Sequence, residues 1–141
     1  MKSTHLLSLV FCSITLLIPG CGSSSSVPCP SDQYLIDHFT LHELEFEKLI
    51  IDPVDAAQLS TLNIQRYFRS SPEQTQIWWF HVWVKDFVGL GGCAKGYAYC
   101  EEPPGSLVDD IDINTQPGAP ENKDIYRHIK GKWYLFYQSN N

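Results

Sequence analysis

The stretch that decides the fold is Ile77-Trp78-Trp79-Phe80-His81-Val82-Trp83-Val84. Every residue in it except His81 is β-branched or aromatic, which is the composition of a β-strand. Side chains alternate between the two faces of a strand, and both faces of this one are apolar. The sequence therefore predicts a strand that is covered on both sides or lies beside an interface.

Residues 93–100 predict a second strand of unusual character. If this segment is extended, one face carries only small side chains (Ala94, Gly96, Ala98 and Cys100), and the other carries larger ones (Cys93, Lys95, Tyr97 and Tyr99). We expect a helix to pack on the small face, because small side chains allow close approach. The face of Lys95, Tyr97 and Tyr99 has polar tips and is predicted to be an exposed ligand surface.

The C-terminal part of the chain predicts a β-hairpin that closes the domain. Residues 125–129 and 132–138 are rich in aromatic and aliphatic side chains, and Lys130-Gly131 between them is a turn dipeptide. Residues 101–122 contain several prolines, glycines and scattered acids, which is typical of a loop. Aromatic residues make up 13% of the chain and concentrate in the predicted strands, so we interpret most of them as core.

Upstream of the strands, Thr40-Leu41-His42-Glu43 matches a capping box. We expect Thr40 to cap a helix over residues 41–51, which Pro53 would end. A helical turn over residues 32–38 is a further option. Residues 59–69 fit either a strand or a helix, and we favour a helix. The predicted class is α+β, with one or two N-terminal helices on an antiparallel sheet of about four strands, all within a single domain of residues 32–141.

The N-terminus has the features of an export signal. Lys2 precedes a thirteen-residue apolar run at residues 6–18, which is too short to span a bilayer. The following Ile18-Pro19-Gly20-Cys21 resembles the lipobox of bacterial lipoproteins, although Pro19 departs from the usual small residue. The resemblance implies that residues 1–20 are a signal peptide and that Cys21 is the lipid attachment site. The alternative is an ordinary secretory signal, with Cys21 as a disulfide cysteine.

The same resemblance implies a place in the cell. Residues 21–31 are rich in serine and would form a flexible tether between the lipid and the domain. Gly22 stands where an aspartate would favour retention in the inner membrane, so the outer membrane is favoured. Taken together, the Trp-Trp-Phe run, residues 95–99, Pro103-Pro104 and residues 133–137 resemble small exported bacterial proteins of unassigned function, and this likeness implies no activity.

Charge argues against one class of partner. The chain carries a net charge of −6, which becomes −7 without residues 1–20, because Lys2 is the only charged residue there. An acidic chain without a basic stripe is a poor nucleic-acid binder, since phosphate neutralisation supplies most of that affinity. Asp109, Asp110 and Asp112 are interpreted as solvated surface rather than a Ca²⁺ site, because the loop lacks the EF-hand pattern. We predict no metal and no cofactor.

Two function classes remain open. The first is a non-enzymatic, membrane-anchored module that binds an envelope protein or glycan, and it is the one we favour. The second is a small envelope hydrolase that uses His81 or His128 with an acid such as Asp86. His81 is more simply a buried neutral histidine. His38 and His42 are four residues apart, but the predicted cap at Thr40 separates them, so a metal site there is a weak interpretation.

The cysteines pose a separate question. Cys29, Cys93 and Cys100 follow Cys21, an odd number for an oxidising compartment, and one pair plus one free thiol is the simplest expectation. A bridge from Cys93 to Cys100 would need a turn at Lys95-Gly96, whereas a continuous strand would hold the two residues roughly 23 Å apart. We favour the continuous strand, which leaves Cys29 free to reach one of the others.

Overall fold

The computed structural model describes residues 27–71, 75–87, 91–116 and 123–140 of the 141-residue chain. The predicted signal peptide and Cys21 lie outside these residues. The described elements, in chain order, are α1 (Asp32–Leu41), α2 (Glu43–Ile51), α3 (Ala56–Thr61), β1 (Arg66–Arg69), β2 (Ile77–Phe87), β3 (Gly91–Cys100), α4 (Ile111–Asn114), β4 (Lys123–Lys130) and β5 (Trp133–Asn140).

The five strands form one antiparallel sheet in the order β1-β2-β3-β5-β4. The α+β class is confirmed, with five strands rather than about four. Three helices precede the sheet, and α4 lies between β3 and β4. The strand predicted from residues 77–84, the continuous strand through residues 93–100 and the C-terminal hairpin are all present.

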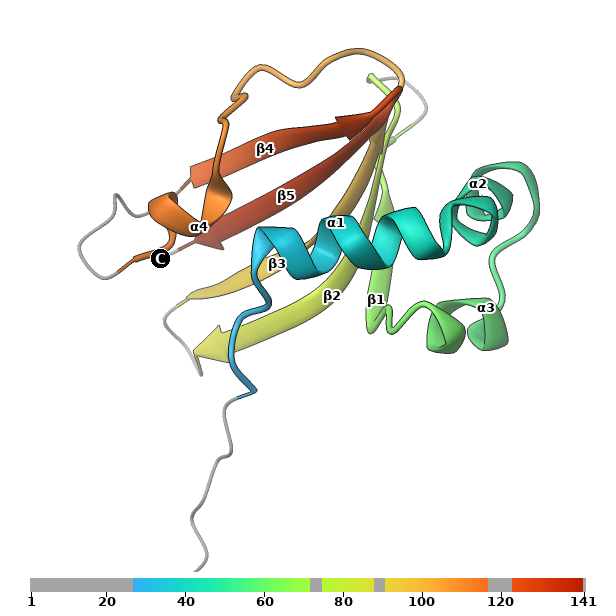
Figure 1. The fold of residues 1–141 in the computed structure, drawn as a ribbon, viewed down its shortest axis with the longest axis horizontal. Helices are drawn as coiled ribbons and strands as arrows, with labels where there is room; N and C mark the ends of the chain where they lie inside the picture. The colour runs from blue at the N-terminus through green and yellow to red at the C-terminus, as the bar shows by residue number, and fades with distance from the viewer. Residues whose placement is uncertain (1–26, 72–74, 88–90, 117–122, 141) are drawn as a thin grey trace, which may run out of the picture.

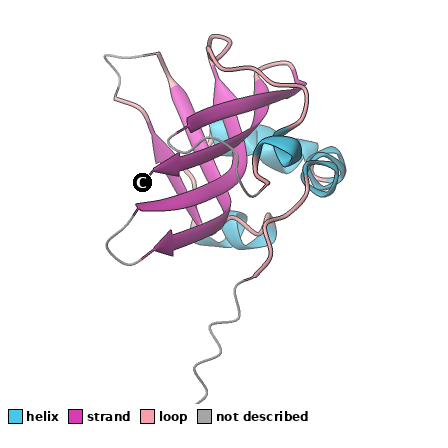
Figure 2. Cartoon of the chain, turned by 90° about the vertical axis from the view of Figure 1, so that its left-hand side faces the viewer, coloured by secondary structure: helices cyan, strands magenta, loops and turns pink. Residues whose placement is uncertain are grey.

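The helices α1, α2 and α3 lie on one face of the sheet (Figures 1 and 2). Between the two layers lies the main core, which holds Leu35, Phe39, Phe46, Leu49, Phe80, Tyr97, Trp133 and Leu135, each no more than 2% exposed. Phe46 packs against Tyr97 and Trp133, with ring centroids 4.6 Å and 5.5 Å apart. Aromatic burial at this layer fixes the first two helices on the sheet.

The predicted cap at Thr40 is wrong. Thr40 lies inside α1, where its hydroxyl donates to the Ile36 carbonyl at 2.8 Å. The N-cap of α1 is Ser31, whose side chain accepts from the Tyr34 amide at 3.2 Å. The 32–38 segment, expected to be a single turn, is therefore most of the first helix. The helix α1 ends at Leu41, His42 separates the two helices, and α2 begins at Glu43.

Residues 59–69 are divided between two elements. The first part belongs to α3, which Asp55 caps through a capping box with Gln58. Asn63 then adopts a φ of 54°, a left-handed conformation that ends helices. The favoured helix is therefore wrong for residues 66–69, which form the edge strand β1.

The expectation that a helix packs on the small face of β3 is also wrong. The helices cover the opposite face, and the small residues lie between large side chains of the flanking strands. Ala98 is paired with Trp79 on one side and with Tyr134 on the other, and Gly96 with His81 and Phe136. Small side chains on the central strand thus make room for rings on its two neighbours, which form a second core cluster on this face.

Gly96 is the least replaceable of these small residues. A Cβ at this position would lie 2.0 Å from the Phe80 carbonyl oxygen and 2.9 Å from the Val82 amide nitrogen, beside the irregularity of β2 between His81 and Trp83. Both neighbours are backbone atoms, so the bulge itself would have to move.

We predict that Gly96→Ala destabilises the domain by about 3 kcal/mol, the upper range for overpacking, because the new methyl group meets backbone. Gly105→Ala is the matched control, since a Cβ there has nothing within 4 Å. Urea unfolding followed by tryptophan fluorescence compares the two variants. Equal unfolding midpoints for the two variants would contradict the prediction.

Candidate functional site

The predicted ligand surface is not on the outside of the domain. Lys95 and Tyr97 are 0% exposed, and Tyr99 is half-buried beneath the helices. The prediction of an exposed face is therefore wrong, because α1 and α2 pack on these side chains. Lys95 and Tyr97 instead belong to the interior, and Tyr99 lies at its margin.

Lys95 is the centre of a buried ion-pair network. Its ammonium nitrogen lies 2.7 Å from Asp32 Oδ1 and 2.6 Å from Asp112 Oδ1, and it donates to the Pro30 carbonyl at 2.9 Å. The ammonium group is thus paired with two carboxylates and one carbonyl. A charge taken fully out of water is tolerated only when it is paired in this way.

Asp32 joins this lysine to two further elements. Its Oδ2 accepts from Arg127 Nη1 at 2.9 Å and from the Ile111 amide at 2.8 Å, while its own backbone amide donates to Asp112 Oδ2 at 2.8 Å. Burial alone would raise the pKa of Asp32, but the hydrogen bonds from Lys95, Arg127 and Ile111 outweigh it and lower the pKa. The carboxylate is thus held ionised, and it ties α1 to β3, α4 and β4.

Two of the three acids interpreted as solvated surface, Asp110 and Asp112, lie at this network, whereas Asp109 is exposed as expected. Oxygen atoms of Asp32, Asp110 and Asp112 lie within 4.8 Å of one another. Asp110 caps α4 by accepting from the Ile113 amide at 3.0 Å, and Asp112 is bound to Lys95. Protein donors thus bind Asp110 Oδ1 and both carboxylate oxygens of Asp112, which holds α4 against Lys95 and the start of α1.

Tyr97 links the sheet to α1. Its hydroxyl donates to the Leu35 carbonyl at 2.9 Å and lies 3.0 Å from His38 Nδ1. The hydroxyl has one hydrogen, so Nδ1 of His38 must be the donor in the second bond. Burial, and then the neighbouring His42, lower the pKa of His38, which keeps its ring neutral. The ring centroids of His38 and His42 are 4.8 Å apart.

Neither histidine of the hydrolase alternative is paired with a carboxylate in the part of the chain that the structure describes. His81 is buried, as expected, with the rings of Phe68 and Phe136 each 5.1 Å from its own. Burial, and then Arg66, lower its pKa to about 4. His128 Nε2 lies 3.0 Å from the Gly131 carbonyl. Asp86 is five positions beyond His81 on β2, roughly 16 Å along an extended strand.

An open groove lies on the sheet face opposite the helices. Its volume is about 290 Å³, and its lining comes from β1, β2, β3 and β5: Arg66, Phe68, His81, Val84, Gly92, Cys93, Ala94, Gln138 and Asn140. Phe68 is 52% exposed, so part of its aromatic ring faces the groove although the ring also contacts His81. Arg66, Gln138 and Asn140 supply planar groups that form hydrogen bonds. An apolar wall with a few convergent polar groups is the usual composition of a small-molecule site.

Sequence reasoning missed this groove for a definite reason. Residues 66–69 were expected to be helical, so Phe68 was never placed beside His81 and the end of β5. The alternation of Leu62, Ile64 and Phe68 was the signal for an extended segment. Only the pairing of Phe68 with Trp79 brings the ring to the open face of the sheet.

We predict that Asp32→Asn lowers the free energy of unfolding by about 3 kcal/mol or more at pH 7, because the buried charge of Lys95 then lacks one of its partners. The folded-state pKa of Asp32 lies below its ordinary value of 3.8, so its contribution is complete above that value and is lost as the pH falls through the lowered pKa. The difference in free energy of unfolding between wild type and Asp32→Asn should therefore become smaller in acid. Urea unfolding at a series of pH values measures it.

The matched control is Asp37→Asn, because Asp37 lies on the same helix and is exposed. This variant should keep the wild-type pH dependence. A gap between wild type and Asp32→Asn that stays constant from neutral pH to strong acid would show that Asp32 is not the titrating group.

Comparison with known proteins assigns no family. No protein-family model, no curated protein and no solved structure matches the chain. Within the described ranges, none of the helices has the length and apolar character needed to cross a membrane. The function of the chain must therefore be argued from its own groove and its own N-terminal sequence.

Proposed function

We propose that the chain is a lipid-anchored envelope protein whose folded domain binds an oligosaccharide in the groove of β1, β2, β3 and β5. The anchor is supported by the apolar run of residues 6–18 and by Ile18-Pro19-Gly20-Cys21. Two or more acyl chains on one residue give stable membrane attachment, since each buried methylene contributes about 0.8 kcal/mol. The outer membrane is the favoured location.

The proposal of an oligosaccharide as the ligand rests on the residues that line the groove. A sugar ring presents apolar C–H faces and a rim of hydroxyl or acetamido groups. The exposed ring of Phe68 offers area for the apolar face, and the amides of Gln138 and Asn140 can donate and accept on the rim. Arg66 adds a planar donor group beside them.

The same lining favours binding over hydrolysis. Glycoside hydrolysis generally uses two carboxyl groups that flank the bond to be cleaved. The described residues that line the groove include no Asp or Glu, and the one titratable base, His81, is buried between aromatic rings with a pKa lowered to about 4 by burial and Arg66. The groove thus has recognition groups without an acid and base pair.

The ligand proposal predicts that Phe68→Ala weakens binding of soluble N-acetylglucosamine tetramers about tenfold, the loss expected when a stacking ring is removed. Tyr67→Ala is the matched control, because Tyr67 is the next residue of β1, is 42% exposed and faces the helix side beside Phe80. Isothermal titration calorimetry of wild type and both variants measures the affinities. No binding by wild type, or the same loss in both variants, would contradict a sugar site at Phe68.

The anchor proposal predicts that wild-type chain incorporates a fatty-acid probe in growing cells and that Cys21→Ala does not. Gel fluorescence of the labelled protein measures incorporation, and Cys29→Ala serves as a control that keeps the lipobox-like segment. Equal labelling of wild type and Cys21→Ala would refute acylation at Cys21.

A further inference from the structure

Residues 27–30 are fixed to the sheet although the sequence predicted a free tether there. The Trp83 indole nitrogen donates to the Val27 carbonyl at 2.8 Å, and the Lys95 ammonium donates to the Pro30 carbonyl at 2.9 Å. Trp83 and Lys95 are directly opposite each other on β2 and β3. The segment therefore crosses over this pair, and Cys29 lies between its two fixed points.

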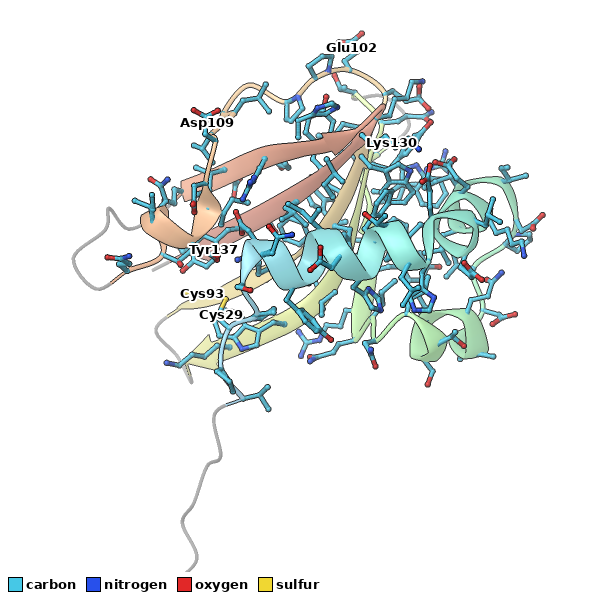
Figure 3. The ribbon with its side chains drawn as sticks, viewed as in Figure 1. Cys29, Cys93, Glu102, Asp109, Lys130 and Tyr137 are labelled. Atoms are coloured by element: carbon cyan, nitrogen blue, oxygen red, sulfur yellow. The ribbon has the colours of Figure 1, made fainter. Side chains whose placement is uncertain are left out.

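Cys93 is the next side chain beside this crossing. It precedes Lys95 by two positions on β3, so both side chains point to the same face of the sheet. Figure 3 shows Cys29 and Cys93 side by side, with Tyr137 close to both. Desolvation raises the pKa of the Cys29 thiol to about 11, although the residue as a whole is exposed, and Lys95 and Cys93 are among the neighbours that act on it.

Tyr137 lies close to both thiols. It is paired with Lys95 on β5, and burial followed by its hydrogen bond with Cys93 raises its pKa, with Cys29 also contributing. Two thiols from segments 64 residues apart thus meet at one point of the domain surface. Both are free in the structure.

We propose that Cys29 and Cys93 form a disulfide that clasps the N-terminal segment to β3. Disulfide oxidants, such as glutathione disulfide or an exported thiol oxidase, would drive the step. One cysteine thiolate attacks the oxidant disulfide and releases one thiolate; the other cysteine then attacks the mixed disulfide, releases the second and closes the bridge. The two protons lost by the cysteines end on the two released thiols, and the oxidant gains two electrons.

Cys100 is excluded from this bridge by its position. It is 1% exposed and packs with Tyr126, Tyr134 and Phe136 on the sheet face opposite Cys93. Burial raises its pKa to about 12. The odd count of cysteines after Cys21 then resolves into one bridge and one buried thiol. In cells, the bridge rests on the proposed export, because an oxidising compartment supplies the oxidant.

The test is peptide mapping of the full chain, purified in detergent and incubated with glutathione disulfide. Free thiols are alkylated before digestion without reductant. Trypsin cuts after Lys48, Lys85, Lys95 and Lys123, so Cys29, Cys93 and Cys100 fall in three different peptides. The expected product joins the peptide of residues 86–95 to the one that ends at Lys48, while the peptide of residues 96–123 is alkylated.

Two variants control the assignment. The linked product should disappear in Cys29→Ser, which keeps Cys21 in the same tryptic peptide, and persist in Cys100→Ser. The proposal is overturned if the peptide of residues 86–95 stays alkylated, carries only glutathione, joins the peptide of Cys100, or remains linked in Cys29→Ser. Mapping of chain alkylated inside intact cells then tests export separately: a bridge that forms with glutathione disulfide but is missing in cells counts against the proposed location alone.

Discussion

The rest of this structure depends on the burial of one positive charge. The ammonium of Lys95 is out of contact with water, and its partners come from Pro30 just before the N-cap of α1, from the first turn of α1 and from α4. Arg127 adds a connection to β4 through Asp32. Breaking a buried pair generally costs about 3–5 kcal/mol, a large share of the stability of a small domain. The network therefore specifies where the N-terminal helix docks, in addition to the less directional packing of Phe39 and Phe46.

The two faces of the sheet are covered in different ways. The helix side is filled by buried rings and aliphatic side chains from α1, α2 and α4 and from the four strands β2 to β5. The other side has no helical layer among the described residues, and rings of the strands themselves cover most of it, with the small residues of β3 between them. The Trp79 indole donates to the Tyr126 hydroxyl at 3.1 Å across this surface. Where that cover ends, beside Phe68 and the last residues of β5, the groove begins.

Local sequence pattern was sufficient for β2, β3 and the C-terminal hairpin, and insufficient for β1 and for the surroundings of the strands. Residues 77–84 and 93–100 are strands because their composition and alternation are local properties. Which face of residues 93–100 is buried depends on Asp32 and Asp112, and no local pattern shows that Lys95 has such partners. The segment of residues 40–43 has the sequence of a capping box, but Ser31 caps the helix instead. The helix α1 starts at Asp32, where this residue pairs with Lys95 and Arg127. The sequence does not predict the groove, because one of its walls is β1 and the pattern of residues 59–69 fits a helix as well as a strand.

The separation in sequence of the ion-pair partners has a consequence for the order of events during biosynthesis. Asp32 and Arg127 are 95 residues apart, and Asp32 and Ile111 are 79 apart. In an emerging chain the first helix is made early, but Asp32 gains Lys95 only after β3 has been made, Ile111 with α4 and Arg127 only with β4. The strand β3 gains its second neighbour only with β5. Contacts of such long range slow folding, because chain closure must come before the contact energy is gained. The complete network can therefore form only when nearly the whole polypeptide is available, which is compatible with the proposed export of an unfolded chain through a narrow translocation channel.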